Sequence, residues 1–209
     1  ANGNVSVDEL AGLDVFALYT CYHADPGTLE FIHGLEDSIE HITYIHRKAD
    51  QYRGGRNSVY MEGQEIKTFG DVEISAAEMD DSAFTLDYLI KADGLTIFYG
   101  GFYPEDIEAF KKEIDFLAGR GERCDLAFLH TTDGDDHPYA AYVMEKLRPK
   151  AVLPMDPEHR VMDYKKMAGW LKAKFPGIQA GCVENPGDAH HYDQGTSRLL
   201  PAFYFSRRM

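Results

Sequence analysis

The sequence predicts an α/β protein with two β-sheets flanked by helices, and two observations lead to this fold class. The first half of the chain is rich in short segments that alternate polar and apolar residues and meet at tight turns. The second half alternates amphipathic helical segments with short apolar strands. No internal repeat or low-complexity linker divides the 209 residues, so we expect a single domain over residues 1–209.

Turn residues separate the elements expected in the first half. Gly70-Asp71 and Asp93-Gly94 each stand between two alternating segments, which is typical of β-hairpins. A Gly/Arg-rich stretch at 53–56 is expected to form another turn. Strands are expected at 14–19, 42–45, 65–69, 72–75, 85–90 and 95–99, with a helix beginning within 27–33.

Apolar spacing sets the elements of the second half. Ile107, Phe110 and Ile114 recur at helical intervals, and Pro138 suits the first turn of a helix. The last apolar segment is expected to close the edge of a sheet. Helices are expected at 104–119, 138–147 and 164–175, and strands at 125–129, 150–154 and 202–206.

The charge balance restricts the partners of the chain. Lys and Arg number 21 against 35 Asp and Glu, which leaves a net charge of −14. Such a chain repels phosphate backbones and anionic lipid, so we expect neither nucleic acid nor a membrane surface as a partner. No apolar run approaches the ~18 residues of a membrane-spanning helix. A small-molecule ligand or substrate is the expected partner.

Cysteine usage bears on the compartment. Cys21, Cys124 and Cys182 are too few and too dispersed for a disulfide framework, and an odd number leaves a free thiol. No signal peptide is visible at the start, so we expect a cytoplasmic protein. Export after removal of an upstream segment is the alternative.

The order of several motifs points to a family. A buried strand is followed by the loop Thr20-Cys-Tyr-His-Ala-Asp-Pro26. Further along, a hairpin is followed by the motif Phe98-Tyr-Gly-Gly101. This motif is followed by a long helix, the strand at 124–129 and the segment Arg148-Pro-Lys-Ala-Val-Leu-Pro-Met155. From about Val5 to Met155 this order resembles the metallo-β-lactamase fold, and most of all its branch of L-ascorbate-6-phosphate lactonases. The resemblance implies an αββα sandwich.

The resemblance also implies a metal site, and here the sequence departs from the family. The family signature is His-x-His-x-Asp-His, in which imidazoles and a carboxylate hold two zinc ions. His23 and Asp25 keep the expected residue types, whereas Pro26 and Phe102 replace a ligand and a bridging aspartate and cannot bind metal. The ligand positions implied by the resemblance are Cys21, His23, Asp25, Pro26, Asp81, Phe102 and Asp156.

Two interpretations of these positions remain open. In the first, Cys21, His23, Asp25, Asp81 and Asp156 are polar remnants of an abandoned site, and no cofactor binds. In the second, they hold one divalent ion (zinc, manganese or iron) that activates water in a hydrolase. Cys21 with His23, oriented by Asp25 as a catalytic group, is a further arrangement for nucleophilic chemistry, weighed against an inert thiol.

Two other polar segments are candidates for substrate binding. His130, Asp133 and His137 lie between a strand and a helix, where open α/β sheets bind ligands. The alternative is a solvated acidic loop in which Asp133 or Asp136 caps the helix.

His190 and His191 follow Pro186-Gly187 and are expected in a loop, from which both can reach one ligand; a surface pair is the alternative. His159 lies three residues after Asp156 and could replace the lost ligand.

Three functions therefore stand as hypotheses. The first is a divergent protein of this fold that has lost its dinuclear site and binds a ligand without catalysis. The second is a metal-dependent hydrolase of an ester, lactone or phosphoester. The third is an interaction subunit completed by a partner strand, because only about 19 residues precede the signature loop where family members have some tens. An unfilled sheet edge also makes a homodimer one expectation.

Overall fold

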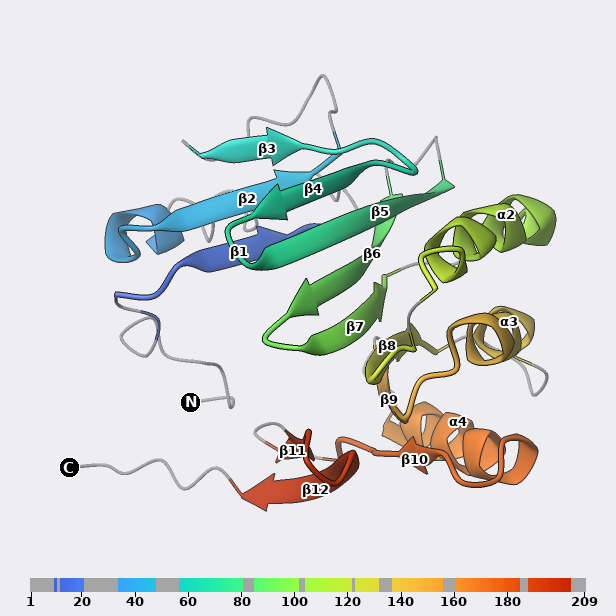
Figure 1. Ribbon diagram of the computed structural model, residues 1–209. Coiled ribbons are helices and arrows are strands. Elements are labelled where there is room, and N and C mark those ends of the chain that lie inside the picture. The colour runs from blue at the N-terminus through green and yellow to red at the C-terminus, as the bar shows by residue number, and fades with distance from the viewer. Residues whose placement is uncertain are drawn as a thin grey trace.

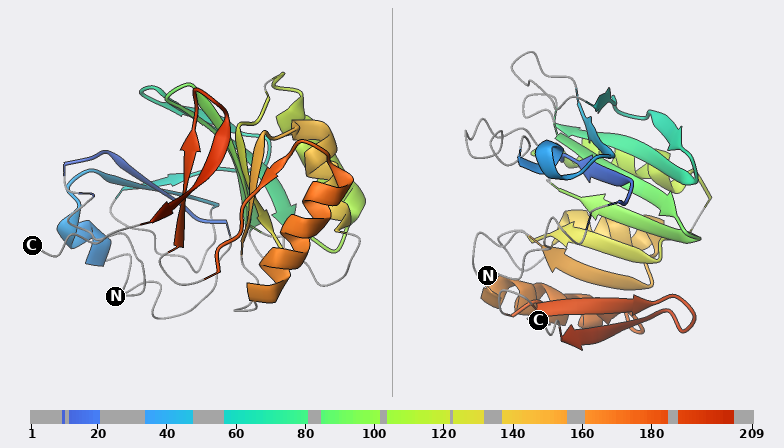
Figure 2. Two further views of the ribbon diagram at one scale, coloured as in Figure 1. Left: turned by 90° about the horizontal axis from the view of Figure 1, so that it is seen from below. Right: turned by 90° about the vertical axis from the view of Figure 1, so that its left-hand side faces the viewer.

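The protein forms two facing β-sheets, with helices over the outer face of the larger sheet (Figures 1 and 2). The coordinates are a computed structural model. It describes residues 10, 12–20, 34–47, 57–80, 85–101, 104–121, 123–131, 137–155, 161–184 and 188–203.

The large sheet has seven strands in the order β10-β9-β8-β7-β6-β5-β4. Strands β4 to β7 form antiparallel hairpins, whereas β7 to β10 run parallel to one another. At the turn between β6 and β7, Asp93 and Gly94 both have positive φ, as an Asp-Gly hairpin turn requires. Its strands are β4 (Ile66–Phe69), β5 (Val72–Asp80), β6 (Thr85–Ala92), β7 (Leu95–Gly100), β8 (Leu126–His130), β9 (Ala151–Met155) and β10 (Gln179–Ala180).

The small sheet is parallel, in the order β1-β2-β3. Its strands are β1 (Val15–Leu18), β2 (Ile42–His46) and β3 (Ser58–Tyr60). The central strand β2 is almost wholly buried, whereas every side chain of β1 is half-exposed. Residues 34–38 are helical and precede β2.

Helices α2 (Ile107–Ala118), α3 (Pro138–Leu147) and α4 (Val161–Lys174) form one layer on the large sheet (Figure 2). The Asp106 side chain caps α2, because it accepts hydrogen bonds from the N–H groups of Glu108 and Ala109 at 2.9 and 3.2 Å. The apolar faces of the three helices and the covered face of the sheet make up the main core. Its fully buried members include Phe98, Phe110, Ile114, Ala127, Leu129, Val143, Val152 and Leu171.

A second core lies between the two sheets. Ile45 and Met61, on the side of the small sheet, pack against Leu86 and Tyr88 of β6. The Tyr88 hydroxyl donates a hydrogen bond to the carbonyl of Tyr19 at 2.7 Å, and this bond ties the two sheets together. Burial raises the pKa of Tyr88, so its hydroxyl keeps the proton that it donates.

Most of the elements expected from the sequence are confirmed, and two expectations are wrong. The last strand does not close the large sheet, because β12 (Arg198–Phe203) pairs with β11 (Asp188–Asp193) in a separate hairpin. The loop expected around His190 and His191 is strand β11 itself. The residue before α3 is His137 in a left-handed conformation, without a side-chain hydrogen bond of its own to the helix; Asp133 and Asp136, the alternative caps, lie outside the described residues. Strand β3 was not expected, since its three residues carry too short a pattern.

None of the helices in the described ranges combines the length and apolar character that crossing a membrane requires. The helix expected to begin within 27–33 and the turn at 53–56 lie outside the described residues.

Candidate functional site

Several strands end at one edge of the large sheet, which we call the strand-end edge. Strands β5, β7, β8 and β9 run in the same direction, so their carboxyl ends lie together. The register places Gly100 beside Leu129 and His130 beside Met155. In open α/β sheets ligands bind beyond such carboxyl ends, which makes this edge the candidate site.

The end of β1 joins the same edge. The backbone N–H of Leu86, near the start of β6, donates to the carbonyl of Thr20 at 2.8 Å. A Cβ atom added to Gly101 would overlap the Thr20 side chain, so these two residues are in direct contact. The chain after β1 and the chain after β7 therefore leave the sheets from adjacent points.

A buried carboxylate supports the turn after β7. Asp87 of β6 is fully buried, and its Oδ1 accepts a hydrogen bond from the N–H of Gly101 at 2.8 Å. A Cβ atom at Gly100 would lie 2.8 Å from a ring carbon of Phe98 and 3.3 Å from Asp87 Oδ2. Only glycine fits at positions 100 and 101 without displacing these groups, so the double glycine serves close packing.

The residues expected to bind metal follow these strand ends in the sequence. Cys21, His23 and Asp25 come after Thr20, Asp81 after β5 and Asp156 after β9. All five lie outside the described residues, as do Pro26, Phe102, Asp133 and His159. Across the ranges that the structure describes, no three His, Cys, Asp or Glu side chains gather where they could hold a metal ion. The assignment of these residues stays a prediction.

The four remaining predicted site residues lie in different parts of the fold. His130 ends β8 and is half-buried beside Met155 at the strand-end edge. His137 is buried in the helix layer, with its ring edge-on to Trp170 and centroids 4.9 Å apart.

In β11, His190 is half-buried and its Nε2 lies 3.0 Å from the Cys182 carbonyl, whereas His191 is exposed. Neighbours in a strand face opposite sides, so this pair cannot hold one ion together. His130 is therefore the member of this set that the structure places at the strand-end edge.

Sequence reasoning missed the residues that hold the strand-end edge together. Asp87 lies between apolar Leu86 and Tyr88, and a charged residue within a buried strand was a signal that could have marked it. His46 is a second buried polar group near this region: its Nδ1 lies 2.9 Å from the Arg47 carbonyl, and its ring meets Tyr60 edge-on at 4.8 Å. Burial lowers the pKa of His46, which keeps the imidazole neutral.

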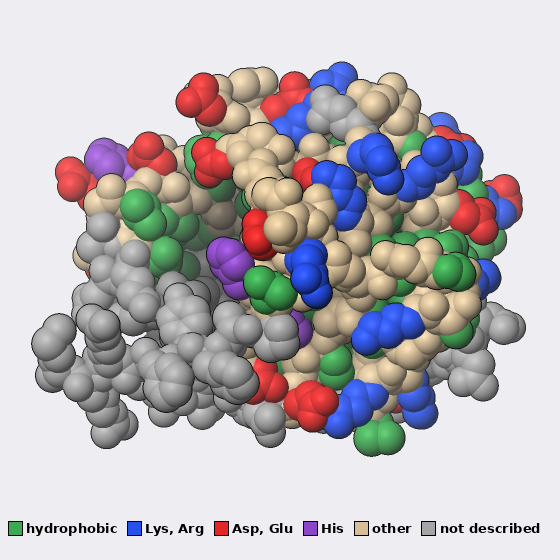
Figure 3. All heavy atoms as spheres, turned by 60° about the horizontal axis from the view of Figure 1, so that its bottom comes forward, with side chains coloured by type: hydrophobic (Ala, Val, Ile, Leu, Met, Phe, Trp, Pro, Cys, Tyr) green, Lys and Arg blue, Asp and Glu red, His purple; other side chains and the backbone are tan. Residues whose placement is uncertain are grey.

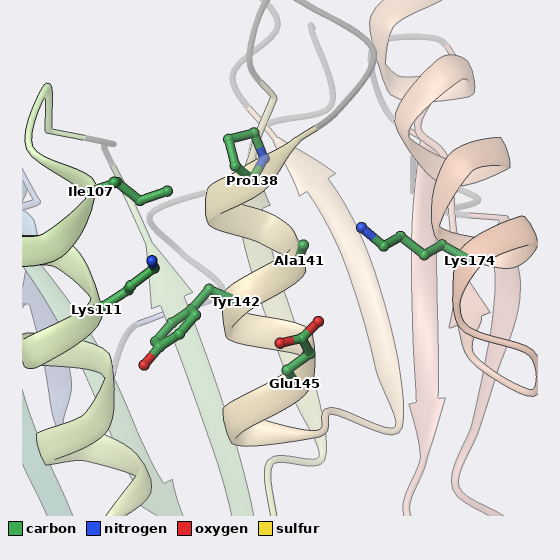
Figure 4. A pocket seen from close by; sticks show the side chains of 7 residues that line it. All are labelled: Ile107, Lys111, Pro138, Ala141, Tyr142, Glu145 and Lys174. Atoms are coloured by element: carbon green, nitrogen blue, oxygen red, sulfur yellow. The ribbon is translucent and has the colours of Figure 1, made fainter.

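A separate open groove of about 530 Å³ lies on the helix layer (Figure 4). Its walls come from α2, α3 and α4, and Lys111 and Lys174 approach it from opposite sides. The Lys174 amine sits over the Trp170 ring, 5.0 Å from its centroid. The remaining lining residues are Ile107, Pro138, Ala141, Tyr142 and Glu145.

Charges of both signs are interspersed over the described part of the face in Figure 3, so the net charge of −14 forms no continuous acidic patch there.

Solved structures supply the comparison. No protein-family model and no curated protein matches the sequence. The chain is similar to CmlA, a diiron β-hydroxylase from Streptomyces venezuelae, with 13% identity and a TM-score of 0.56 over 81% of this chain and 44% of CmlA. It is also similar to the metallo-β-lactamase fold protein YhfI from Bacillus subtilis, with 14% identity and a TM-score of 0.57 over 80% of this chain and 75% of YhfI.

The chain therefore spans less than half of CmlA's length. Sequence identities this low show a shared fold and not a shared activity. The resemblance to the lactonase branch therefore stays a prediction. The two facing sheets, the helix layer and these similarities together establish that this chain has the metallo-β-lactamase fold.

Proposed function

We propose that this chain is a divergent metallo-β-lactamase-fold protein that has lost the dinuclear metal centre and binds a small ligand at the strand-end edge without catalysis. The observation that carries the proposal is the contact between Thr20 and Gly101. It joins the two chain segments to which the family resemblance assigns ligands for two metals. In this sequence those segments contain Pro26 and Phe102, neither of which offers a metal-binding atom.

The donor set does not fit a dinuclear centre. In the family pattern, a bridging water between two metals requires a carboxylate at position 102 and a ligand at position 26, and this sequence has phenylalanine and proline there. The groups described at the edge favour binding instead. His130 offers a ring nitrogen beside apolar Met155, and a few polar groups on an apolar surface are typical of small-molecule sites.

The metal content of protein purified without chelator tests this proposal. We expect less than about one metal ion in ten chains by elemental analysis, and no thermal shift with zinc, manganese or iron. A positive control is the double substitution Pro26→His with Phe102→Asp, which returns two ligand types and should raise zinc retention.

The single-metal hydrolase is the competing function, and the same experiment separates it. His23, Asp25, Asp81 and Asp156 all follow strand ends that meet at one edge, and this convergence favours it. About one metal ion per chain that is lost in Asp81→Ala, but kept in the turn variant Asp71→Ala, would refute the proposal. Metal-dependent cleavage of a lactone, ester or phosphoester that disappears in Asp81→Ala would refute it equally.

A further inference from the structure

The open groove on the helix layer follows one side of α3. Pro138, Ala141, Tyr142 and Glu145 line it, and their spacing of three and four residues places them in one stripe along the helix. Helices α2 and α4 supply the walls on either side (Figure 4). All the lining residues belong to the described ranges, and the volume of about 530 Å³ lies within the range of roughly 300–1,000 Å³ that is typical of small-molecule sites.

The floor of the groove is apolar. Ile107, Pro138 and Ala141 offer carbon surfaces, and the ring of Tyr142 lies beside them. The Tyr142 hydroxyl donates a hydrogen bond to the Asp115 carboxylate of α2 at 3.0 Å, which holds the ring against the neighbouring helix. The floor is therefore in place before a ligand binds, and it can accept the apolar body of a small molecule.

The two walls each present a lysine, but only one of these cations has a carboxylate partner. Lys111 forms an ion pair with Glu108 at 2.7 Å, within α2. The Lys174 amine instead lies 5.0 Å from the ring centroid of Trp170 and 6.0 Å from that of Phe175, and no described carboxylate pairs with it. Lys174 therefore carries a positive charge that the carboxylate of a ligand can neutralise.

Glu145 supplies the opposite charge in the same groove. Its side chain is exposed on α3, and no described cation pairs with it. Figure 4 shows Lys174 extending from α4 toward Ala141, whereas Glu145 lies one helical turn further along α3. Four residues of helix span about 6 Å, so the groove presents a cation and an anion that are separated along its length.

We propose that this groove binds a small zwitterion with an apolar body between its two charges. The carboxylate of the ligand binds Lys174, its ammonium group binds Glu145, and its body lies on Ala141 and Tyr142. The charges of the groove itself select this ligand, because a simple anion would be repelled by Glu145 and a simple cation by Lys174. A peptide of two apolar residues has the required shape, since two extended residues span about 7 Å.

The zwitterion site is separate from the ligand site proposed above. The groove lies on the helix layer, and none of its lining residues belongs to the strands that form the strand-end edge. Metal analysis tests the strand-end edge, and the titration below tests the groove. Either proposal can therefore fail without the other.

The probe is the dipeptide leucyl-leucine, added to the full chain labelled with ¹⁵N. Trp170 is the one tryptophan of the sequence, so its indole N–H gives a single signal in the NMR spectrum. Because the Lys174 amine lies over this ring, the signal should shift when a carboxylate binds the amine. We expect a saturable shift with a dissociation constant in the millimolar range, since the groove is open and its ion pairs are exposed to solvent.

Three analogues of the probe test the parts of the ligand separately. N-acetylation removes the ammonium group and amidation removes the carboxylate. Each should weaken binding about two- to fivefold, which is the effect of losing one exposed ion pair. Glycylglycine keeps both charges but lacks the apolar body, and it should bind at least about tenfold more weakly than leucyl-leucine.

Substitutions in the chain assign each end of the ligand to its partner. In Lys174→Gln amidation of the probe should no longer weaken binding, and in Glu145→Gln N-acetylation should no longer weaken it, because each variant lacks the partner of the deleted charge. The matched control is Lys172→Gln, which removes the same charge from an exposed position of α4 that does not line the groove and should bind like the parent. An unchanged urea midpoint verifies that these surface variants fold.

Three results would overturn the proposal. The first is the absence of a saturable shift of the Trp170 signal. The second is unchanged affinity after N-acetylation of the probe, since it would identify a simple anion as the occupant. The third is equal weakening by Lys174→Gln and Lys172→Gln, which would indicate attraction to the general charge of α4 rather than binding in the groove.

Discussion

Substitution of Gly101 by alanine tests the contact that joins the chain after β1 to the chain after β7. The new Cβ would overlap the Cβ, Oγ1 and Cγ2 atoms of Thr20. Thr20 Cβ is attached to the backbone, so no side-chain rotation can relieve the overlap and one segment must move. Overpacking of this kind costs about 1–3 kcal/mol, and we expect the upper part of that range.

The partner substitution Thr20→Gly removes all three overlapping atoms. By itself it should cost about 1 kcal/mol, chiefly through chain entropy. In the double variant the added methyl group occupies the space that Thr20 vacated, so the costs should not add. We expect a coupling free energy of about 2 kcal/mol between the two positions.

Urea denaturation of the parent, both single variants and the double variant measures this coupling. Gly101→Ala alone should lower the melting temperature by about 4–12 °C for a chain of this size. Gly169→Ala is the matched control, because nothing beyond its own helix backbone lies within 4 Å of the added Cβ, and an alanine at this exposed position of helix α4 should add about 1 kcal/mol of stability. Additive effects of Gly101→Ala and Thr20→Gly within about 0.5 kcal/mol would refute the contact and with it the convergence of the two segments.

Three further predictions concern buried polar groups. Tyr88→Phe should cost about 1–2 kcal/mol in urea denaturation, because it leaves the Tyr19 carbonyl without its donor at 2.7 Å; an unchanged midpoint would contradict the tie between the sheets. Asp125→Ala should cost about 2 kcal/mol, since the N–H of Thr96 loses its acceptor at 2.8 Å, and Asp125→Asn, which keeps an acceptor, should cost less; equal losses would contradict this role.

For His46, burial lowers the pKa below 6.5, so the unfolded chain binds a proton at a pH where the folded chain does not. The free energy of unfolding should therefore reach its full value above about pH 6.5 and fall as the pH drops below it. His46→Asn should reduce this dependence on pH between about pH 7 and 5. An unchanged dependence would assign the effect to other groups.

Local sequence patterns predicted most of the helices, strands and turns of the fold. The Asp-Gly turn at Asp93-Gly94 needs positive φ at both residues, a local steric requirement, and the structure has it there. Helix α3 begins at Pro138 as expected, since proline at the first helical position loses no hydrogen bond. Strand β11 was missed because Asp188 to Asp193 are mostly polar, and among the described strands they pair only with β12, across a short turn. Its strand character comes from that partner and not from its own composition.

For the candidate site, the residue types could be predicted from the sequence, whereas the placement of the residues could not. The sequence itself shows that proline and phenylalanine occupy positions 26 and 102, and these two residue types are the argument against a dinuclear centre. The sequence does not show where the histidines lie. The structure places His130 at the strand-end edge, His137 against Trp170 and His190 against the Cys182 carbonyl. Their different surroundings arise from contacts with residues that are not their neighbours in the sequence.

The sequence by itself determined the α/β class, the hairpins and helices, and the absence of ligand-forming side chains at two family positions, because all of these follow from local sterics, periodicity and residue chemistry. Only the tertiary structure decided that Thr20 meets Gly101, that Asp87 holds the turn after β7, and that β12 pairs with β11 rather than with a strand of the large sheet. Strand order and register create these features, and they depend on which strands become neighbours in space, a choice made by long-range packing.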